Sequence, residues 1–433
     1  MKAVDDYRLQ LGSDEYVPIV VGGMGVNIST ADLALEACRL GGIGHVSDAM
    51  SPFVADKKFG THYTKTKTGR YKDTRDGLDK TTVKFDLEEL ARAQRTFVDN
   101  VMARKQGDGA IFINVMEKLT MGAAADTLRA RLNAALDAGI DGITLSAGLH
   151  NNSLKLIKDN PRFRDAKIGI IVSSVRALKI FLRSAKRCDR FPDYVIVEGP
   201  LAGGHLGFGE DWADYQLSNI VMEVIQFLKD ESLEIPVIPA GGVFTGTDAV
   251  EFLEAGAGAV QVATRFTVTR ECGLPERTKQ AYFRATEDDV FVSTVSATGY
   301  LLRLLTISPC LGSNVKPQCE PFGYTLSSQG TCSYLDAYAE TPFGPDGKKL
   351  PVQSKICLCY HFSKNNCYTC GHYVYRLKDT SRMLPDGQYQ LLSAEHVFRD
   401  YQFSKEHEVA RPEPEVAYTG GLTGGLLAQG GLK

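Results

Sequence analysis

A histidine next to two glycines is the arrangement with the clearest chemical meaning in this chain. Gly203, Gly204 and His205 follow an apolar, β-branched run at 194–197 that has the length of a strand. The glycines let the backbone approach an anionic group closely, and an imidazole moves protons near neutral pH. Because α/β proteins bind ligands at the carboxyl ends of strands, we expect a cofactor site here with His205 as its acid-base group.

Cysteines form the second chemical feature. Three of the ten cysteines are spread over the first 300 residues, and the other seven lie between Cys310 and Cys370. In a reducing compartment such clustering is more typical of a metal or iron-sulfur site than of a disulfide framework. The uneven distribution also predicts a separate functional unit.

Charge and hydropathy limit the class of protein. Forty-nine Lys and Arg against 52 Asp and Glu give a net charge of −3, so no overall field favours nucleic acid or a membrane surface. The first residues contain no apolar leader, and no apolar run reaches the roughly 18 residues of a spanning helix. We therefore expect a cytoplasmic protein with a sizeable core, and a homodimer is compatible with this composition.

The elements that position these groups alternate over the first 300 residues. Apolar, β-branched runs predict eight strands, at 16–21, 43–47, 110–115, 142–146, 168–173, 194–197, 236–239 and 259–262. Apolar residues recurring at intervals of three and four predict helices at 30–40, 86–104, 123–138, 175–186, 217–229 and 247–254. Eight such repeats are typical of a TIM (β/α)8 barrel, and an open doubly wound sheet is the alternative, because periodicity does not show closure.

Three segments depart from this repeat. An insertion at 51–84 is polar and rich in Lys and Arg, and it is expected over the active face, since it follows the second strand. It is either a solvated insertion, or a lid or docking site for an acidic partner. The predicted division is a barrel at 1–305, a cysteine-rich segment at 306–400 and a flexible, glycine-containing tail at 401–433.

Glycines recur at other predicted strand ends. Gly22-Gly23-Met24-Gly25 follows the first strand, and Gly241-Gly242 follows the seventh. The eighth strand ends in Gln261-Val262-Ala263-Thr264, which offers a hydroxyl. Loops after the seventh and eighth strands of TIM barrels commonly bind phosphate through backbone N–H groups. The sequence therefore predicts a phosphate-bearing ligand between these loops.

Together, these motifs resemble those of the nitronate monooxygenase (2-nitropropane dioxygenase) superfamily of FMN-dependent TIM barrels, which includes flavin enoyl-ACP reductases. The resemblance covers about residues 15–305 and adds the run at 113–116 to the loops above. It implies that FMN binds at the carboxyl face of the barrel, with His205 facing the flavin as catalytic base. The cofactor-binding residues implied in this way are Gly22, Gly23, Met24, Asn114, Glu198, Gly203, Gly204, Gly241, Gly242, Gln261, Val262, Ala263 and Thr264.

Within this superfamily the chain looks most like the acyl-ACP dehydrogenase/isomerase of unsaturated fatty acid synthesis. Glu198 stands where nitronate monooxygenases usually have Gln, and 263–266, 269–272 and 299–303 also match that branch. The resemblance implies FMN together with a [4Fe-4S] cluster. His205 would remove the proton α to a thioester carbonyl while hydride leaves the β-carbon, or would return a proton elsewhere and isomerise the product. The basic insertion would receive an acidic acyl carrier protein.

The cluster ligands are predicted from the same resemblance. Cys310, Cys319 and Cys332 fall close to three cysteine positions of the branch, but a non-cysteine near Asn314 occupies the fourth. The predicted set is therefore Cys310, Cys319, Cys332 and Cys359, with Cys357, Cys367 and Cys370 as alternatives for the fourth ligand. Zinc, a separate site on the last four cysteines, and unliganded thiols are the other interpretations.

Other functions would use the same residues. A nitronate monooxygenase would use FMN and His205 on a nitroalkane, an NAD(P)H-dependent enoyl-ACP reductase would run the reaction in reverse, and a flavin or iron-sulfur redox sensor would need only the cysteines. The other histidines have structural alternatives. His150 either contacts substrate or begins a surface helix, His45 packs near the second strand, and His361 and His372 either complete a metal site or lie in loops.

Overall fold

Eight parallel strands close into a barrel in the computed structural model, which describes residues 2–117, 123–323, 331–406 and 409. The barrel strands are β3 (Ile19–Val21), β4 (Ile43–Ser47), β5 (Ala110–Met116), β6 (Gly142–Ser146), β7 (Lys167–Val172), β8 (Tyr194–Glu198), β10 (Val237–Ala240) and β11 (Val260–Val262). The last strand pairs with the first, with Val260 opposite Ile19, so the open sheet is excluded and the TIM barrel is confirmed.

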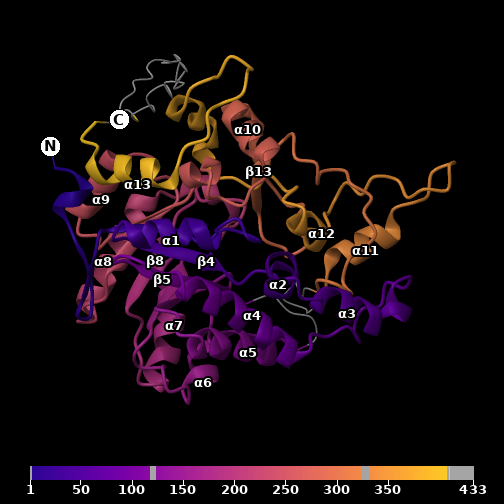
Figure 1. The fold of residues 1–433 in the computed structure, drawn as a ribbon, viewed down its shortest axis with the longest axis horizontal. Helices are drawn as coiled ribbons and strands as arrows, with labels where there is room; N and C mark the ends of the chain where they lie inside the picture. Colours follow the sequence, from indigo (N-terminus) through magenta and orange to yellow (C-terminus); the bar gives the residue numbers. More distant parts are fainter. Residues whose placement is uncertain (1, 118–122, 324–330, 407–408, 410–433) are drawn as a thin grey trace, which may run out of the picture.

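Helices surround this barrel, as Figure 1 shows. They are α1 (Ala31–Arg39), α4 (Leu87–Met102), α5 (Ala124–Asp137), α6 (Ser153–Ile157), α7 (Val175–Arg187), α8 (Leu217–Asp230) and α9 (Gly246–Glu254). Each of α1, α4, α7 and α9 begins after a Ser, Thr or Asp whose side chain accepts from a backbone N–H of the first turn. The helices with an apolar stripe were predictable from sequence, whereas the five-residue α6 has too few turns to show one.

A few buried polar groups lie among the apolar side chains of the barrel interior. His45 is fully buried, with Nδ1 2.9 Å from the Val21 carbonyl and Nε2 2.5 Å from the Thr144 hydroxyl. Burial lowers the pKa of His45 to about 4, so the ring is neutral and ties β4 to β3 and β6. The expectation that His45 packs near the second strand is therefore met, and the residue belongs to the core.

A small antiparallel sheet lies outside the barrel and includes the glycine-histidine motif. Its order is β12 (Val290–Ser293), β13 (Leu302–Leu305) and β9 (Gly204–His205). Leu302 lies opposite His205, and Arg303 lies opposite Gly204. The loop after β8 is therefore held by chain that follows the barrel. A two-residue strand has no periodicity, which is why the sequence did not predict this sheet.

The insertion and the cysteine-rich segment form one lobe, on the right in Figure 1. The insertion folds into α2 (Ser51–Phe59), α3 (Tyr63–Arg70) and η2 (Lys72–Thr74), and α11 (Ser333–Glu340) and α12 (Leu358–Ser363) come from the later segment. Lys67 donates to the carbonyl oxygens of Cys319 and Glu320, and Lys80 pairs with the Glu320 carboxylate at 2.5 Å. Both lysines are buried, so the lysines of the insertion are not all available to a partner.

The last described helix packs back onto the barrel. The remaining elements are η1 (Val4–Asp6), β1 (Leu9–Leu11), β2 (Asp14–Tyr16), η3 (Trp212–Asp214), η4 (Thr264–Val268), α10 (Glu276–Arg284), η5 (Glu287–Asp289), η6 (His372–Thr380) and α13 (Ala394–Phe403). Asp400 of α13 forms a buried ion pair with Arg265, at 2.7 Å, and Gln402 donates to Asp5. The predicted tail at 401–433 begins within this helix, and residues 407–408 and 410–433 lie outside the described residues.

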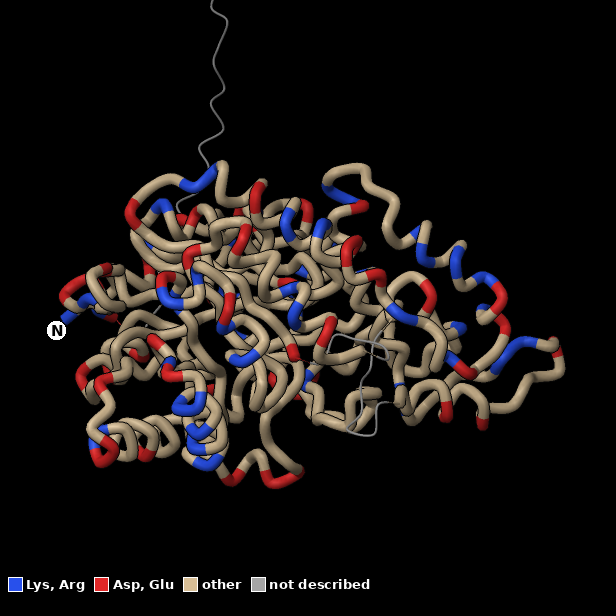
Figure 2. The backbone as a smooth tube through the Cα atoms, turned by 90° about the horizontal axis from the view of Figure 1, so that it is seen from below, with Lys and Arg blue, Asp and Glu red and all other residues tan. Residues whose placement is uncertain are grey.

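Charged residues of both signs are interspersed along the chain (Figure 2), as the near-neutral net charge predicts. Among the described residues, no helix is both long and apolar enough to cross a membrane.

Candidate functional site

The predicted cofactor residues of the first and eighth strand ends lie against one another. A Cβ placed on Gly23 would collide with Cβ of Asn114, and one on Gly22 would lie 3.1 Å from Cδ of Gln261. The two glycines therefore leave no gap between the loop after β3 and the ends of β5 and β11. This packing brings the predicted flavin residues of three strands to one place.

Two amide oxygens in this cradle have no partner. Oδ1 of Asn114 and Oε1 of Gln261 are buried and make no hydrogen bond within the described part of the chain. A buried polar atom without a partner is costly and marks a place where a ligand or water is expected. A bound ligand or water with N–H or O–H donors would satisfy these oxygens.

A buried ion pair between Asp48 and Arg131 fixes the backbone beside Asn114. Asp48 follows β4 and pairs with Arg131 of α5 in a fully buried contact. Asp48 also accepts from the Met116 N–H, and Arg131 donates to the Met116 carbonyl at 2.8 Å. These bonds fix the end of β5 and, with it, the backbone that carries Asn114.

The glycines after the seventh barrel strand adopt backbone conformations that other residues rarely reach. Gly241 and Gly242 have φ of 89° and 104°, and a Cβ on Gly241 would lie 2.8 Å from the Ala202 nitrogen. The loops after β8 and β10 are therefore in direct contact. Gly203 in turn abuts Cys370 and Gly371, and Gly371 abuts the Thr264 hydroxyl. The loops predicted to bind phosphate thus lie close together. Residues 370–371, which the sequence did not assign to the site, lie beside them.

His205 is oriented by a hydroxyl from outside the barrel. Its Nε2 lies 2.7 Å from Oγ of Ser296, which is itself 2.7 Å from Oγ1 of Thr298. Phe362 of α12 packs edge-on against the ring. Burial lowers the pKa of His205 to about 4, so the imidazole is neutral at physiological pH and able to accept a proton.

Glu198 is the last residue of β8, and the loop that follows it leads to His205 in β9. Burial raises the pKa of its carboxyl to about 7. Its strand neighbour is Ala240, which lies opposite Gln261 on the other side. Glu198 is therefore at the same end of the barrel as the two unpaired amide oxygens and holds a proton near neutral pH.

The predicted cysteine ligands are only partly brought together. Cys319 and Cys332 act on the pKa of Cys359, and Cys357 acts on the pKa of all three. Cys310 makes its nearest contacts elsewhere. Its thiol contacts Ser308 at 3.0 Å and Cys367, because the chain turns at 308–310 toward the loop at 366–367.

Cys319, Cys332, Cys357 and Cys359 therefore neighbour one another, and Cys357 also acts on the pKa of Cys367, which in turn contacts Cys310. Burial raises the pKa of Cys370 to about 12, although the neighbouring Arg303 guanidinium acts in the opposite direction. Among the residues that the structure describes, no three His, Cys, Asp or Glu side chains converge closely enough to hold a single metal ion. The four thiols are close enough to share electrostatics but do not meet at one point.

The remaining histidines have structural roles. His150 is fully buried, with its ring nitrogens 2.7 Å from the Ser153 hydroxyl and the Ser146 carbonyl, so it ties the start of α6 to the end of β6. His361 contacts the Ser313 hydroxyl at 2.8 Å, and His372 lies 3.9 Å from Glu287. Neither contacts the cysteine group through these bonds.

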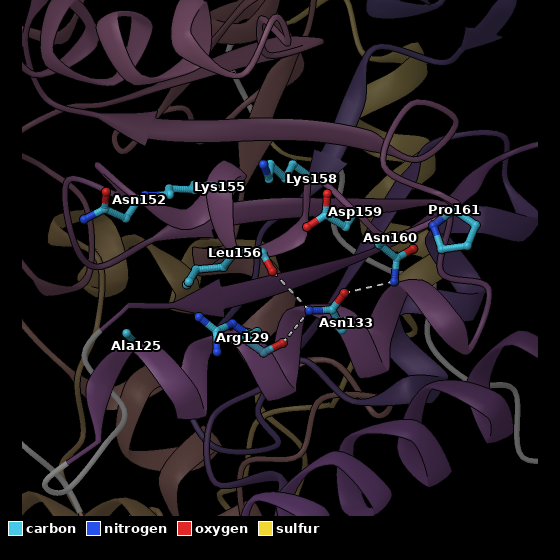
Figure 3. Close-up of a pocket in the computed structure, with 10 residues that line it drawn as sticks. All are labelled: Ala125, Arg129, Asn133, Asn152, Lys155, Leu156, Lys158, Asp159, Asn160 and Pro161. Carbon is cyan, nitrogen blue, oxygen red and sulfur yellow. Dashed lines mark hydrogen bonds between the residues drawn. The ribbon is translucent and has the colours of Figure 1, made fainter.

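A hollow on the outer helices is separate from this site. It has a volume of about 770 Å³ and lies between α5 and the segment around α6 (Figure 3). Asn133 receives a hydrogen bond from Asn160 across it, at 3.0 Å. None of the predicted site residues lines this hollow, so the candidate site remains the strand ends described above.

Sequence reasoning missed three parts of the site: Ser296, the guanidinium of Arg303 and the 370–372 segment. All three come from chain beyond the last barrel strand. Arg303 had drawn attention only as part of a family-like motif, without a role. Ser296 and Gly371 carry no local signal, because their roles depend on long-range packing.

Comparisons with known proteins agree with the fold. The profile of the nitronate monooxygenase family matches residues 12–333. A probable nitronate monooxygenase from Staphylococcus saprophyticus is 34% identical over 105 residues, 24% of this chain and 29% of that protein. The (3aS,4S,5R,7aS)-5-hydroxy-7a-methyl-1-oxo-octahydro-1H-indene-4-carboxyl-CoA dehydrogenase of Mycobacterium tuberculosis is 34% identical over 126 residues, 29% of this chain and 32% of that enzyme. The alignments thus span about a third of the length of these relatives.

Solved structures extend the likeness to most of the chain. FabK from Thermotoga maritima has a TM-score of 0.54 at 17% identity, and covers 89% of this chain and 91% of its own. Nitroalkane oxidase from Streptomyces ansochromogenes has a TM-score of 0.54 at 18% identity, with coverages of 89% and 94%. At these identities the likeness concerns the fold. The profile match over most of the chain, on a barrel with this cradle, shows that the protein belongs to the nitronate monooxygenase family of FMN-dependent oxidoreductases.

Proposed function

We propose that this chain is an FMN-dependent dehydrogenase of acyl thioesters. The observation that carries the proposal is the neutral, oriented imidazole of His205 on the loop beside a cradle with two unpaired amide oxygens. A base fixed next to a flavin suits reactions that take a proton and a hydride from neighbouring carbons.

The residues divide the work of this reaction. The strand-end glycines and Thr264 would bind the cofactor, and Asn114 and Gln261 would offer it acceptor oxygens. His205 takes the proton α to the thioester carbonyl at Nδ1, because the hydroxyl of Ser296 holds Nε2. FMN, when bound, would supply the acceptor for the hydride from the β-carbon, with dioxygen or another electron acceptor as the final oxidant. Isomerisation of the unsaturated product would require His205 to remove a γ-proton from it, giving a dienolate, and to return that proton to the α-carbon.

The thioester is favoured over a nitroalkane by two observations. One relative is a carboxyl-CoA dehydrogenase, so thioester chemistry occurs among proteins similar to this chain. Glu198 supplies a second group that exchanges a proton near neutral pH, which nitronate oxidation does not require. Nitronate oxidation is the second candidate, because a probable nitronate monooxygenase is among the similar proteins.

We also propose an iron-sulfur cluster on Cys319, Cys332, Cys357 and Cys359. A cluster needs four thiolates spread around several iron atoms, and a single zinc ion needs four that converge at about 2.3 Å from one centre. Cys319, Cys332 and Cys357 are all near enough to Cys359 to raise its pKa, which supports a shared site for these four buried thiols. The cation of Lys67 lies near Cys319 and Cys359 and would offset the cluster's negative charge.

The acyl group is proposed to arrive on coenzyme A or on an acyl carrier protein. Exposed cations of the insertion, such as Lys58, Lys65 and Lys72, would contact the acidic carrier. Lys67 and Lys80 are excluded from this role because they are buried against the cysteine-rich segment.

Anaerobic titration of the purified protein tests the proposal. A saturated acyl thioester should bleach the flavin absorption of the wild type, and H205A should keep its flavin but resist bleaching. Bleaching by a nitronate alone would identify the second candidate, and bleaching by NADPH alone would identify a reductase. A wild-type protein that binds no flavin would overturn the proposal at its first step.

A further inference from the structure

Arg303 is a buried cation without a counter-ion. Its side chain is fully buried, and no carboxylate pairs with it in the described part of the chain. The guanidinium lies 4.7 Å from the centre of the Trp212 ring. An unpaired buried charge is strongly unfavourable, so this environment is incomplete without an anion.

The guanidinium lies under the loop that contains the glycine pair. Nη1 donates to the carbonyl oxygens of Pro200 and Ala202, at 2.7 and 2.5 Å. Nη2 is buried and has no partner among the described residues. Arg303 therefore uses one nitrogen to hold the loop and keeps another for a further acceptor.

The segment at 370–372 closes the space around this loop. The Cys370 N–H donates to the Arg303 carbonyl, and the His372 N–H donates to the Leu201 carbonyl at 3.1 Å. Between them, Gly371 abuts both Gly203 and the Thr264 hydroxyl. Arg303, the glycine loop and the Thr264 hydroxyl thus all contact the 370–372 segment, beside the loops that are expected to bind the phosphate of a cofactor.

The nearest alternative counter-ion is the Cys370 thiol. Burial raises its pKa to about 12, so it is neutral at physiological pH and does not balance the guanidinium. The loop glycines offer only uncharged N–H donors. A phosphate with up to two negative charges would satisfy both the cation and the loop.

We infer that Arg303 is the charged partner of the FMN phosphate. The inference rests on the proposed use of FMN. It assigns to this chain a cofactor contact from outside the barrel, on a strand that pairs with the loop bearing the catalytic base.

Comparing FMN with riboflavin, which lacks the phosphate, tests the inference. On the full-length protein stripped of flavin, R303Q should weaken FMN binding roughly 10- to 100-fold, as for loss of a hydrogen bond to a charged group. Riboflavin affinity should change by less than about twofold, since the phosphate contact is absent. R303K, which keeps the charge, should restore most of the preference for FMN.

The matched control is R190Q. Arg190 also donates to backbone carbonyls and lies before β8, at the other end of the barrel, so both affinities should stay unchanged. Equal weakening of FMN and riboflavin in R303Q, or no weakening, would overturn the inference and leave flavin use intact. A wild type that binds neither flavin would overturn the proposed function itself.

A measurement on the unmodified chain does not depend on how a variant folds. Inorganic phosphate should raise the riboflavin affinity of the wild type, because it supplies the missing anion beside Arg303. Phosphate that competes with riboflavin, or has no effect, would contradict the assignment.

Discussion

Nε2 of His205 and Oγ of Ser296 lie 2.7 Å apart, although one residue is in a barrel loop and the other follows the outer strand β12. The hydroxyl fixes the orientation of the imidazole ring. The orientation of His205 therefore depends on Ser296, a residue that lies outside the barrel.

Replacing Ser296 by Ala should lower kcat roughly tenfold, which corresponds to about 1.4 kcal/mol of activation free energy. KM and FMN affinity should stay near wild type, since the hydroxyl acts on the base. S313A is the matched control, because it removes a serine-histidine contact outside the site. Steady-state kinetics of both variants check this, and an unchanged kcat in S296A would show that the ring needs no such support.

The activity should depend on pH through two groups. His205 is protonated only below its pKa of about 4, so kcat/KM should rise with pH near 4 and then level off. Glu198 loses its proton near pH 7, so a second change in kcat/KM is expected near that pH. A pH-rate profile of E198Q should keep the first change and lose the second. A change near pH 7 that persists in E198Q would have to come from another group.

Glu198 should also make stability depend on pH. Folding raises its pKa from an ordinary value near 4.5 to about 7, so the folded state holds the proton more tightly. Stability is therefore greatest below about pH 4.5 as far as this group is concerned, and falls as pH rises toward 7. Thermal unfolding of flavin-free protein should show a smaller fall in E198Q. Parallel curves for the two proteins would contradict the assignment.

Removing one partner of the Lys80–Glu320 pair should be costly. Both side chains are at most 3% exposed, and a buried pair left with one charge loses about 3–5 kcal/mol. E320Q and K80M should therefore unfold at lower denaturant concentration, whereas the double variant should recover part of the loss. A cycle of chemical denaturation measurements gives the coupling. Additive effects would mean that the pair does not hold the insertion to the cysteine-rich segment.

A methyl group at Gly23 should disturb the flavin cradle. The added Cβ would collide with Asn114, so G23A is expected to lower FMN affinity by about tenfold or more. G69A is the matched control, because the space around Gly69 in α3 is open. Flavin fluorescence titration compares the two. Normal FMN binding by G23A would remove Asn114 from the cofactor site.

The cysteine assignment separates two thiols that the sequence treats alike. C357S should lose iron and acid-labile sulfide, whereas C310S should keep both, since Cys310 faces Ser308 and Cys367. Metal analysis and the visible spectrum of the two purified variants check this. Loss of iron in C310S with retention in C357S would restore the set predicted from sequence.

The barrel was predictable because its strands and helices repeat with regular periods. Strands 43–47 and 142–146 have the same bounds in the structure as in the prediction. The glycines at the strand ends could also be identified, because the backbone conformations needed there favour glycine. Ser296 and Arg303 could not be given roles, because their contacts depend on the pairing of β13 with a two-residue strand. The contacts of Cys310 with Ser308 and Cys367 could not be predicted, because spacing along the chain does not show the direction of a turn.

The contact between His372 and Leu201 has a consequence for the order of assembly during synthesis. A nascent chain can close its barrel once β11 has emerged, but the loop bearing His205 gains Ser296, Arg303 and the 370–372 segment only later. Until then the imidazole would be hydrated and titrate near its ordinary pKa, and the flavin cradle would be open on one side. The barrel would therefore fold before the site is complete. The cofactor would have time to bind before residues 370–372 pack against the loop.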